Sequence, residues 1–534
     1  MSTPNPFGGK FSIAWGIACM VSASTLSQAA PPGTKSSQPD SSPTFTILHT
    51  NDIHGHLESW QGWEGDLKNQ SVGGLDRLSA RVRDVRRATG SDSVLLLDAG
   101  DTFGDTMIAV ETEGHALIEV MNAIGYDAMV IGNHEPDFTA EKLQDRIREA
   151  RFPVLAANIS ERSSGKLFAK PYIIRTIKGV KVGILGLAYP NTPKTSAQKN
   201  IINLRFDNAV ETARTYVPRL RREGAQIVIA LTHLGLGADK QLAEKVAGID
   251  IIVGGHSHNR LNAPLQVGTT LIVHAGAHGS DLGRLDIKIA NDHIASHSYT
   301  LIPLTGETSG RPLADLIARQ LAPYEQQMNV AIGRALTLIP RAQTLAGQEP
   351  EKRDAESPAD DLFADAIRDT TRTEVAFLPG LGYGVALQPG EITAAQLRNL
   401  IPHDSAVWTM RLTGEQIRQV LEQAIENFSA KDPAEKVGGM IQVSGLQFSY
   451  DPEAQPDRRV REIKVAGRPL ELRRSYTVAV NALLAEGGHN YQTFKSGLDR
   501  RELGKQYEMV KSWIGTRGEV AAPSMNRILK MSDQ

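Results

Sequence analysis

Residues 45–54 read Phe-Thr-Ile-Leu-His-Thr-Asn-Asp-Ile-His, a short apolar run that ends in an aspartate and a histidine. Similar apolar runs recur up to about residue 302, and several are continuous rather than alternating, which is typical of strands buried on both faces. Segments with helical spacing separate them, namely Leu75–Arg87, Ala116–Ala123, Ala140–Ala150, Asn208–Arg222 and Lys240–Val246. This alternation predicts a layered α/β domain. The further apolar runs are Val94–Leu97, Met129–Ile131, Val154–Ala157, Val182–Leu187, Ile227–Leu231, Ile251–Val253 and Leu271–Val273.

Several of these predicted strands are followed by side chains of the types that bind metal ions. In open α/β sheets, binding sites lie at the carboxyl ends of the strands, so residues that follow different strands can meet. Glycine accompanies many of these positions and permits the sharp turns that such a site needs. The residues concerned are Asp52 and His54, Asp98 and Asp101, Asn133 and His134, His233, and His256 and His258.

The residue types indicate a pair of divalent metal ions. Two ions about 3.5–4 Å apart can activate one water and bind the oxygens of a phosphate, and a bridging carboxylate holds them together. Imidazole and the oxygens of Asp and Asn suit zinc, manganese or iron. A thiolate site is excluded, because the single cysteine, Cys19, lies in the N-terminal segment. Each motif alone is more often a turn or a helix start, so the prediction depends on all of them occurring together.

The motifs Asn-Asp-x-His, Asp-Ala-Gly-Asp, Gly-Asn-His-Glu, Thr-His-Leu-Gly and Gly-Gly-His-Ser-His, in this order over residues 51–258, resemble those of the calcineurin-like metallophosphoesterases. More narrowly, the chain is similar to the bacterial family of 5'-nucleotidases, UDP-sugar hydrolases and 2',3'-cyclic phosphodiesterases. Segments Leu412–Gln416, Gln442–Phe448 and Gly487–Tyr491 resemble the nucleoside-binding domain of that family. The resemblance implies a four-layer-type α/β metallophosphoesterase domain and a C-terminal mixed α+β substrate-binding domain. The implied activity is hydrolysis of nucleotide phosphate esters by a hydroxide that two divalent ions of the Mn, Zn or Fe class activate.

The resemblance also implies a role for each site residue. Asp52, His54 and His258 hold one ion, while Asn133, His233 and His256 hold the other. Asp101 bridges the two ions. His134 contacts the phosphoryl oxygens and stabilises their developing charge, and Asp137 keeps its imidazole oriented and protonated. Asp98 supports the centre without binding an ion.

The pattern changes after about residue 331, and five segments are predicted. They are a signal peptide over residues 1–29, a disordered leader over 30–43, a metallophosphoesterase domain over 44–305, a linker helix over 306–331 and a C-terminal 5'-nucleotidase-like domain over 332–530. In the last segment, Arg459–Val465 and Tyr476–Val480 are predicted as antiparallel strands. Asp360–Thr370 and Gly414–Asn427 are predicted as helices.

The C-terminal segment departs from the family at the positions expected to bind the substrate. Residues 377–384 stand where the family has Asn-Gly-Gly-Gly-Ile-Arg, so the phosphate-binding Arg is missing unless Arg398 or Arg411 replaces it. Tyr491 matches one of the two aromatic residues that clamp the base, and Met440 stands where the other is expected. The residues predicted to bind the substrate are Tyr383, Met440, Gln442 and Tyr491.

The N-terminus and the charge balance bear on location and partners. Phe11–Thr25 is mostly apolar and Ser27–Ala29 offers a cleavage site, which predicts a signal peptide and a periplasmic or secreted protein. A short membrane anchor and a lipid-modified Cys19 are the alternatives to cleavage. Lys plus Arg number 58 and Asp plus Glu number 60, so a nucleic acid is not an expected partner. The predicted partner is a small phosphate ester, and no stable membrane insertion is expected after cleavage.

The sequence is also compatible with other functions. The stretch around Pro379-Gly380 also resembles the thiosulfohydrolase of bacterial sulfur oxidation, which releases sulfate from a protein-bound cysteine. A UDP-sugar or cyclic-nucleotide phosphodiesterase fits the same motifs. A binding protein that retains the fold without turnover belongs to a different class, and the intact set of ligand residues argues against it.

Overall fold

The computed structural model describes residues 44–307, 310–341, 355–381, 384–401 and 404–531. The predicted signal peptide, the leader, Cys19 and Tyr383 lie outside these residues. Nothing in the described part of the chain is a helix long and apolar enough to cross a membrane.

The N-terminal half contains two six-stranded sheets. In the first sheet, of order β16-β15-β1-β4-β5-β6, strands β1, β4, β5 and β6 run parallel and β15 and β16 form an antiparallel hairpin. In the second sheet, of order β13-β14-β12-β11-β9-β8, the four central strands run parallel and both edge strands antiparallel. The first sheet comprises β1 (Thr44–Thr50), β4 (Val94–Asp98), β5 (Ala128–Val130), β6 (Val154–Leu155), β15 (Asp281–Ala290) and β16 (His293–Pro303), and the second comprises β8 (Tyr172–Ile177), β9 (Val180–Leu187), β11 (Ile227–Thr232), β12 (Ile251–Gly254), β13 (Leu265–Val267) and β14 (Thr270–Val273).

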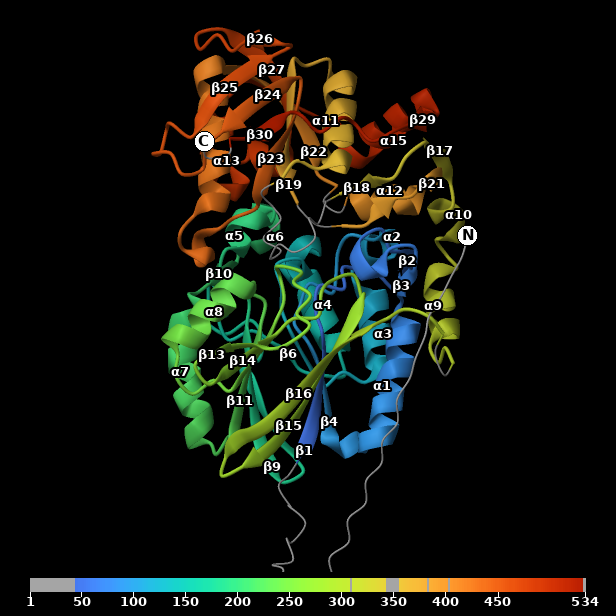
Figure 1. Cartoon of the computed structure of the whole chain (residues 1–534), viewed down its shortest axis with the longest axis vertical. Coiled ribbons are helices and arrows are strands. Elements are labelled where there is room, and N and C mark those ends of the chain that lie inside the picture. Colours follow the sequence, from blue (N-terminus) through green and yellow to red (C-terminus); the bar gives the residue numbers. More distant parts are fainter. Residues whose placement is uncertain (1–43, 308–309, 342–354, 382–383, 402–403, 532–534) are drawn as a thin grey trace, which may run out of the picture. The chain divides into compact units, whose positions relative to one another are not determined.

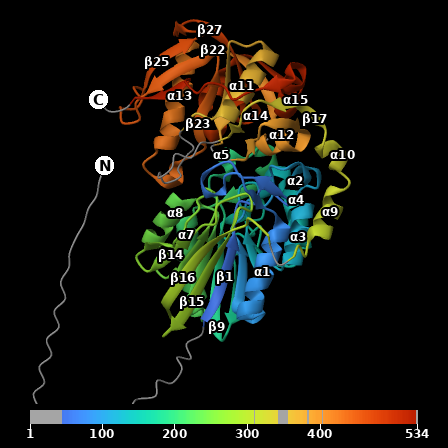
Figure 2. The same ribbon diagram turned by 45° about the vertical axis from the view of Figure 1, so that its right-hand side comes forward.

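The two sheets pack face to face, and helices cover their outer faces. One buried cluster joins Ile47 and Leu97 of the first sheet to Ile229 and Val253 of the second. Helices α1 (Leu75–Thr89), α3 (His115–Ile124) and α4 (Ala140–Glu149) share a core with the first sheet, while α7 (Ala209–Arg222) and α8 (Leu236–Lys245) share one with the second. Figures 1 and 2 show α1 and α7 on opposite sides of the sheets. The predicted four-layer α/β arrangement is therefore confirmed.

A polar segment leads from β16 into the C-terminal half. A single linker helix was predicted over residues 306–331, but the described part of this segment has two helices, α9 (Ala314–Leu321) and α10 (Glu325–Met328). Pro323 stands between them, and proline lacks the backbone N–H that a continuous helix requires.

The C-terminal half is mixed α+β, as predicted. Its five-stranded sheet has the order β23-β19-β27-β22-β28, and a four-stranded sheet has the order β26-β25-β24-β30. Strand β25 (Val460–Val465) is antiparallel as predicted, whereas β27 (Ser475–Asn481) is antiparallel to β22 but parallel to β19. The remaining elements of this half include β17 (Ala331–Ala335), β19 (Val375–Gly380), β20 (Ala386–Leu387), β21 (Gly390–Thr393), β22 (Ala406–Thr413), β23 (Gly439–Ser444), β24 (Leu446–Tyr450), β26 (Arg468–Pro469), β28 (Leu498–Lys505), β29 (Glu519–Val520), β30 (Ile528–Lys530), α11 (Pro358–Thr371), α12 (Ala394–Leu400), α13 (Gly414–Ser429) and α15 (Gln506–Arg517).

Local sequence explains where α13 begins. The Thr413 hydroxyl accepts from Gln416 N, and the Gln416 side chain accepts from Thr413 N, which forms a capping box. The motif Leu412–Gln416, singled out in the sequence, is therefore a helix start in this fold.

Candidate metal centre

The predicted ligand residues meet at the carboxyl ends of parallel strands from both sheets. Asp52 and His54 follow β1, Asp101 follows β4, and Asn133 and His134 follow β5. His233 follows β11 of the second sheet, and His256 and His258 follow β12. Three sets have their ligand atoms within 4.8 Å of one another, namely Asp52, His54 and His258; His54, Asp101 and His134; and Asp101, His233 and His256.

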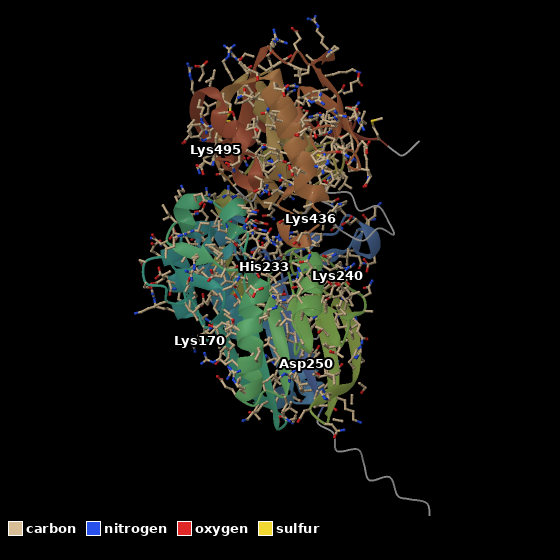
Figure 3. All side chains as sticks on the ribbon, turned by 90° about the vertical axis from the view of Figure 1, so that its left-hand side faces the viewer. Lys170, His233, Lys240, Asp250, Lys436 and Lys495 are labelled. Carbon is tan, nitrogen blue, oxygen red and sulfur yellow. The ribbon has the colours of Figure 1, made fainter. Side chains whose placement is uncertain are left out.

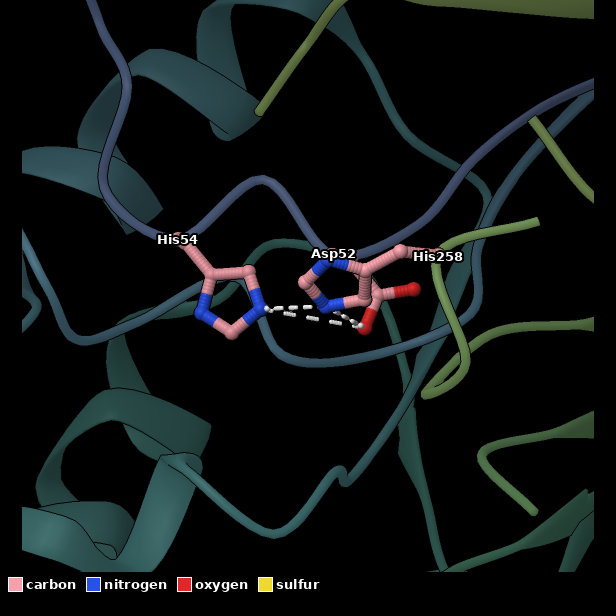
Figure 4. Close-up of side chains that lie close together, drawn as sticks. All are labelled: Asp52, His54 and His258. Carbon is pink, nitrogen blue, oxygen red and sulfur yellow. Dashed lines mark hydrogen bonds and ion pairs between the residues drawn. The ribbon is translucent and has the colours of Figure 1, made fainter. Parts of the chain in front are cut away.

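The first set is a compact group of three side chains (Figure 4). His54 Nε2 lies 3.1 Å from His258 Nε2 and 3.8 Å from Asp52 Oδ1. His258 Nε2 lies 3.3 Å from the same carboxylate oxygen. A lone pair on each imidazole and one carboxylate oxygen thus converge on one point, as the ligands of a single cation do.

Asp101 connects this set to the second. Its Oδ2 lies 3.0 Å from His233 Nε2 and 3.9 Å from His54 Nε2. The Asn133 Oδ1 atom is buried and has no hydrogen-bond partner among the residues that the structure describes. A buried amide oxygen without a partner is costly, and a cation would satisfy it. These donors fit two divalent ions with Asp101 between them.

Backbone strain is concentrated at the same positions. Asp52, His54, Asp101, His256 and His258 have φ of 53°, 49°, 53°, 80° and 57°, in the left-handed region that non-glycine residues seldom adopt. Each such residue costs about 1–3 kcal/mol, so the surrounding fold must hold it in place. Close approach also requires glycine, because a Cβ at Gly132 would lie 2.2 Å from Asp101 Oδ1.

Three histidines of the centre hold Nδ1 close to an oxygen acceptor, while Nε2 faces the cluster. His233 Nδ1 lies 2.7 Å from the Ala99 carbonyl oxygen, and His134 Nδ1 lies 2.7 Å from Asp137 Oδ2. His54 Nδ1 lies 3.1 Å from Asp105 Oδ2. Nδ1 therefore carries the proton in each ring, which leaves the Nε2 lone pair of His54 and His233 available for an ion.

The charges of the centre follow from these contacts. Burial disfavours the imidazolium of His134, but the carboxylates of Asp101 and Asp137 outweigh burial and raise its pKa to about 10. Burial opposes ionisation of Asp101, yet the neighbouring His233, His134 and His54 lower its pKa well below the usual value. The Asp101 carboxylate is thus ionised and His134 is a cation at neutral pH.

Two buried carboxylates that the sequence did not identify support the loops. Glu135 Oε1 accepts from Thr102 N and Phe103 N, and its Oε2 accepts from Asp101 N and Gly132 N. It therefore ties the loop after β4 to the loop after β5. The second of these carboxylates is Asp105, which lies beside His54. In the sequence, only its position four residues after Asp101, in a turn that contains glycine, could have indicated it. Asp98 accepts from Thr50, Thr102 and Gly100 N, in line with a supporting role.

The segment after β9 touches the centre from outside. The Tyr189 ring lies 4.0 Å from the His256 ring at an interplanar angle of 30°, and Ser196 donates to the Asn133 carbonyl oxygen at 3.0 Å. Tyr189 also donates to the carbonyl oxygen of Lys436, a residue of the C-terminal half that is labelled with His233 in Figure 3. This segment was not singled out in the sequence.

Three further buried histidines near the ligand loops have different surroundings. His274 pairs with Asp239 in the core at 2.9 Å, and His49 lies 3.3 Å from the Tyr299 hydroxyl. His278 lies closer to the centre, with its ring 5.5 Å from that of His258. His278 N also donates to the Asp52 carbonyl oxygen. His278 therefore supports a ligand loop, whereas His49 and His274 are core residues.

The side chains that were predicted to bind the nucleobase are buried in this structure. Met440 and Tyr491 are both 0% exposed and belong to the same apolar core of the C-terminal half. The Gln442 side chain is buried too, since it accepts from Ser357 N and donates to the carbonyls of Ala355 and Met440. In this structure Met440 is therefore a core residue with no exposed face.

Arg398 and Arg411, the two candidates to replace the missing phosphate-binding arginine, both have partners in this structure. Arg398 pairs with Asp404 at 3.2 Å and packs over Tyr507. Arg411 donates to the Ser475 hydroxyl at 3.0 Å. Both guanidinium groups are thus bound to partners within the C-terminal half.

Two families account for most of the chain. Residues 45–260 match the calcineurin-like phosphoesterases, and residues 332–496 match the 5'-nucleotidase C-terminal domain. The 5'-nucleotidase of Bos taurus is 28% identical, and the alignment covers 91% of each chain. The trifunctional nucleotide phosphoesterase YfkN of Bacillus subtilis is 27% identical over 91% of this chain, which spans only 35% of that longer protein.

Solved structures agree with these matches. A 5'-nucleotidase precursor from Thermus thermophilus superposes with a TM-score of 0.83 at 27% identity, covering 92% of this chain and 100% of that one. The sulfate thiohydrolase SoxB of the same genus superposes with a TM-score of 0.81 at 24% identity, covering 92% of this chain and 97% of that one. At that identity, the second likeness shows a shared fold alone.

Proposed function

The chain belongs to the calcineurin-like phosphoesterases that carry a 5'-nucleotidase C-terminal domain, and from this we propose that it hydrolyses nucleotide phosphate esters at a centre of two metal ions. The observation that carries the proposal is the position of Asp101, whose carboxylate is grouped with His54 and His134 on one side and with His233 and His256 on the other. Its relatives named 5'-nucleotidase align over nearly the whole chain.

Each ligand residue has a place in this proposal. Asp52, His54 and His258 hold one ion. Asn133, His233 and His256 hold the other, and Asp101 touches both. The donors are imidazoles, carboxylates and one amide oxygen, which suit Mn, Zn or Fe. When bound, the ions supply Lewis acidity to the phosphoryl oxygens and an activated water.

His134 acts on the substrate and Asp137 acts through it. The His134 imidazolium offers its Nε2 proton to a phosphoryl oxygen, where negative charge develops as the ester bond breaks. Asp137 accepts from Nδ1 at 2.7 Å, which fixes the ring and keeps it charged. His134 is thus the proposed catalytic residue and Asp137 a positioning residue.

The segments predicted from the sequence are assigned roles in the proposed function. We assign catalysis to residues 44–305, the connection to 306–331 and substrate recognition to 332–530. Residues 1–29 act as a signal peptide, and the mature chain starts near Ala30 in the periplasm or outside the cell. The partner is a small nucleotide rather than a nucleic acid.

The test is hydrolysis of adenosine monophosphate by protein loaded with Mn²⁺, before and after chelation, with the His134→Ala protein alongside. We expect phosphate release that chelation abolishes and that falls about 10²–10³-fold in His134→Ala, with the metal content unchanged. The absence of turnover with any nucleotide by a protein that holds two ions would instead indicate a binding protein.

A further inference from the structure

Asp105 is a buried carboxylate beside the centre for which neither the motifs nor the proposed ligand set gives a role. Only 3% of its surface is exposed. Its Oδ2 lies 3.1 Å from His54 Nδ1, the ring nitrogen that faces away from the ligand cluster. His54 Nε2 faces the cluster, at 3.8 Å from Asp52 Oδ1 and 3.9 Å from Asp101 Oδ2. The carboxylate therefore touches a ligand and does not belong to the ligand groups themselves.

The backbone at Asp105 is in a conformation that favours glycine. Its φ is 61°, a left-handed value that non-glycine residues seldom adopt, although aspartate tolerates it better than most. An aspartate in this strained backbone conformation inside a buried site indicates a side-chain contact whose stabilisation outweighs the strain.

The surrounding hydrogen bonds hold this turn against the loop that carries His54. His54 N donates to the Asp101 carbonyl oxygen and Gly55 N to the Thr102 carbonyl oxygen, both at 2.9 Å. Thr106, the next residue after Asp105, caps α2 (Met107–Glu111) and donates its hydroxyl to the Gly55 carbonyl oxygen at 2.9 Å. The distance between Asp105 and His54 is thus fixed from both sides.

We propose that Asp105 is a positioning residue that sets the affinity of the Asp52–His54–His258 site for its metal ion. It accepts the Nδ1 proton of His54, which fixes the ring tautomer and its orientation and makes Nε2 a better donor. At the second ion site the ligand His233 differs in this respect, because its Nδ1 lies against the neutral Ala99 carbonyl oxygen at 2.7 Å. The inference rests on the proposed function, since it requires that this group hold an ion.

Two substitutions separate the charge from the contact. Asp105→Asn keeps the shape of the side chain and the tolerance for left-handed backbone but removes the negative charge. Asp105→Gly removes the acceptor while accommodating a φ of 61° without strain. Ala466→Gly is the matched control, because Ala466 also has a left-handed φ, of 48°, and is an exposed residue between β25 and β26 of the C-terminal half.

The experiment loads each protein with Mn²⁺, titrates a chelator and counts the retained ions per chain by elemental analysis. The parent and Ala466→Gly should lose both ions at the same chelator concentrations. Asp105→Gly should lose one ion with an affinity lowered ~10- to 100-fold, and Asp105→Asn should lose the same ion with a smaller shift. Melting of the metal-free proteins checks that each variant is folded, and Asp105→Asn carries the test alone if Asp105→Gly does not fold.

Two results would overturn the inference and are distinguishable. If the parent binds two ions and both Asp105 variants retain both with the parent affinity, Asp105 has no positioning role and the proposed function stands. If the parent binds fewer than two ions, the dinuclear centre and the inference built on it are both wrong.

Discussion

Single side-chain contacts decide how the reactive side chains of the centre are charged. The clearest case is the pair formed by His134 Nδ1 and Asp137 Oδ2 at 2.7 Å. Burial alone would keep the imidazole neutral, but the carboxylates of Asp101 and Asp137 raise its pKa to about 10. His134 is therefore protonated below that value and loses its charge as the pH rises through it.

Asp137→Asn should move the alkaline limb of the pH–activity profile to lower pH. The substitution removes one of the charges that raise the pKa of His134, so the imidazolium is lost at a lower pH. We expect a lower kcat at high pH with the metal content unchanged, measured as kcat against pH together with elemental analysis. An alkaline limb that stays in place in the variant would show that His134 does not titrate there, and the His134→Ala protein, which should have no such limb, is the control.

At the scale of elements, the sequence predicted the strands that carry the centre. The runs at β1, β4, β5, β11 and β12 are apolar segments because both faces of each strand are covered. The ligands could be predicted because they directly follow these strands. The hairpin β15–β16 was not recognised, since β16 is mostly exposed and has no continuous apolar run.

The supporting contacts could not be predicted, because they join residues that are distant in sequence. Glu135 binds amides of a loop 32 to 34 residues earlier in the chain. Tyr189 and His256 meet only because β9 and β12 are neighbours of β11 in the second sheet. The burial of Met440 and Tyr491 likewise depends on how the C-terminal sheet packs, which local sequence does not specify.

Glu135→Gln should loosen the two loops that it joins. Each carboxylate oxygen accepts two backbone N–H groups, and the NH₂ of glutamine would face two donors in place of an acceptor. We expect the free energy of unfolding to fall by about 1.5–3 kcal/mol in denaturant titrations. Glu161→Gln, at the half-buried last position of β7 (Ile159–Glu161), is the control and should change little. Equal stability of the parent and Glu135→Gln would mean that these amides find other partners.

At the scale of the whole molecule, which ester is cleaved depends on contacts to the rest of the substrate as well as on the metal centre. The relatives named 5'-nucleotidase favour nucleotides, whereas the missing phosphate-binding Arg and the buried Met440 and Tyr491 indicate weak contacts to the rest of the substrate. Contacts that are alike in the ground state and the transition state affect KM rather than kcat.

A substrate panel should rank nucleoside monophosphates first, with a high KM and little difference between bases. The panel comprises nucleoside monophosphates, nucleotide sugars, 2',3'-cyclic nucleotides, an aryl phosphate and a peptide that carries a cysteine thiosulfonate, compared by kcat/KM with the same Mn²⁺-loaded protein. A higher kcat/KM for the aryl phosphate would mean that the C-terminal half contributes no nucleoside recognition. Sulfate release from the peptide would show that the chain catalyses the reaction for which the sulfate thiohydrolase, a protein of the same fold, is named.

The most direct test of the dinuclear centre is anomalous diffraction from crystals grown with Mn²⁺. We expect two anomalous peaks about 3.5–4 Å apart. One should lie among Asp52, His54 and His258, the other among Asn133, His233 and His256, and the Asp101 carboxylate should contact both. A single peak in fully loaded crystals, or two peaks that do not share Asp101, would contradict the assignment on which the proposed function depends.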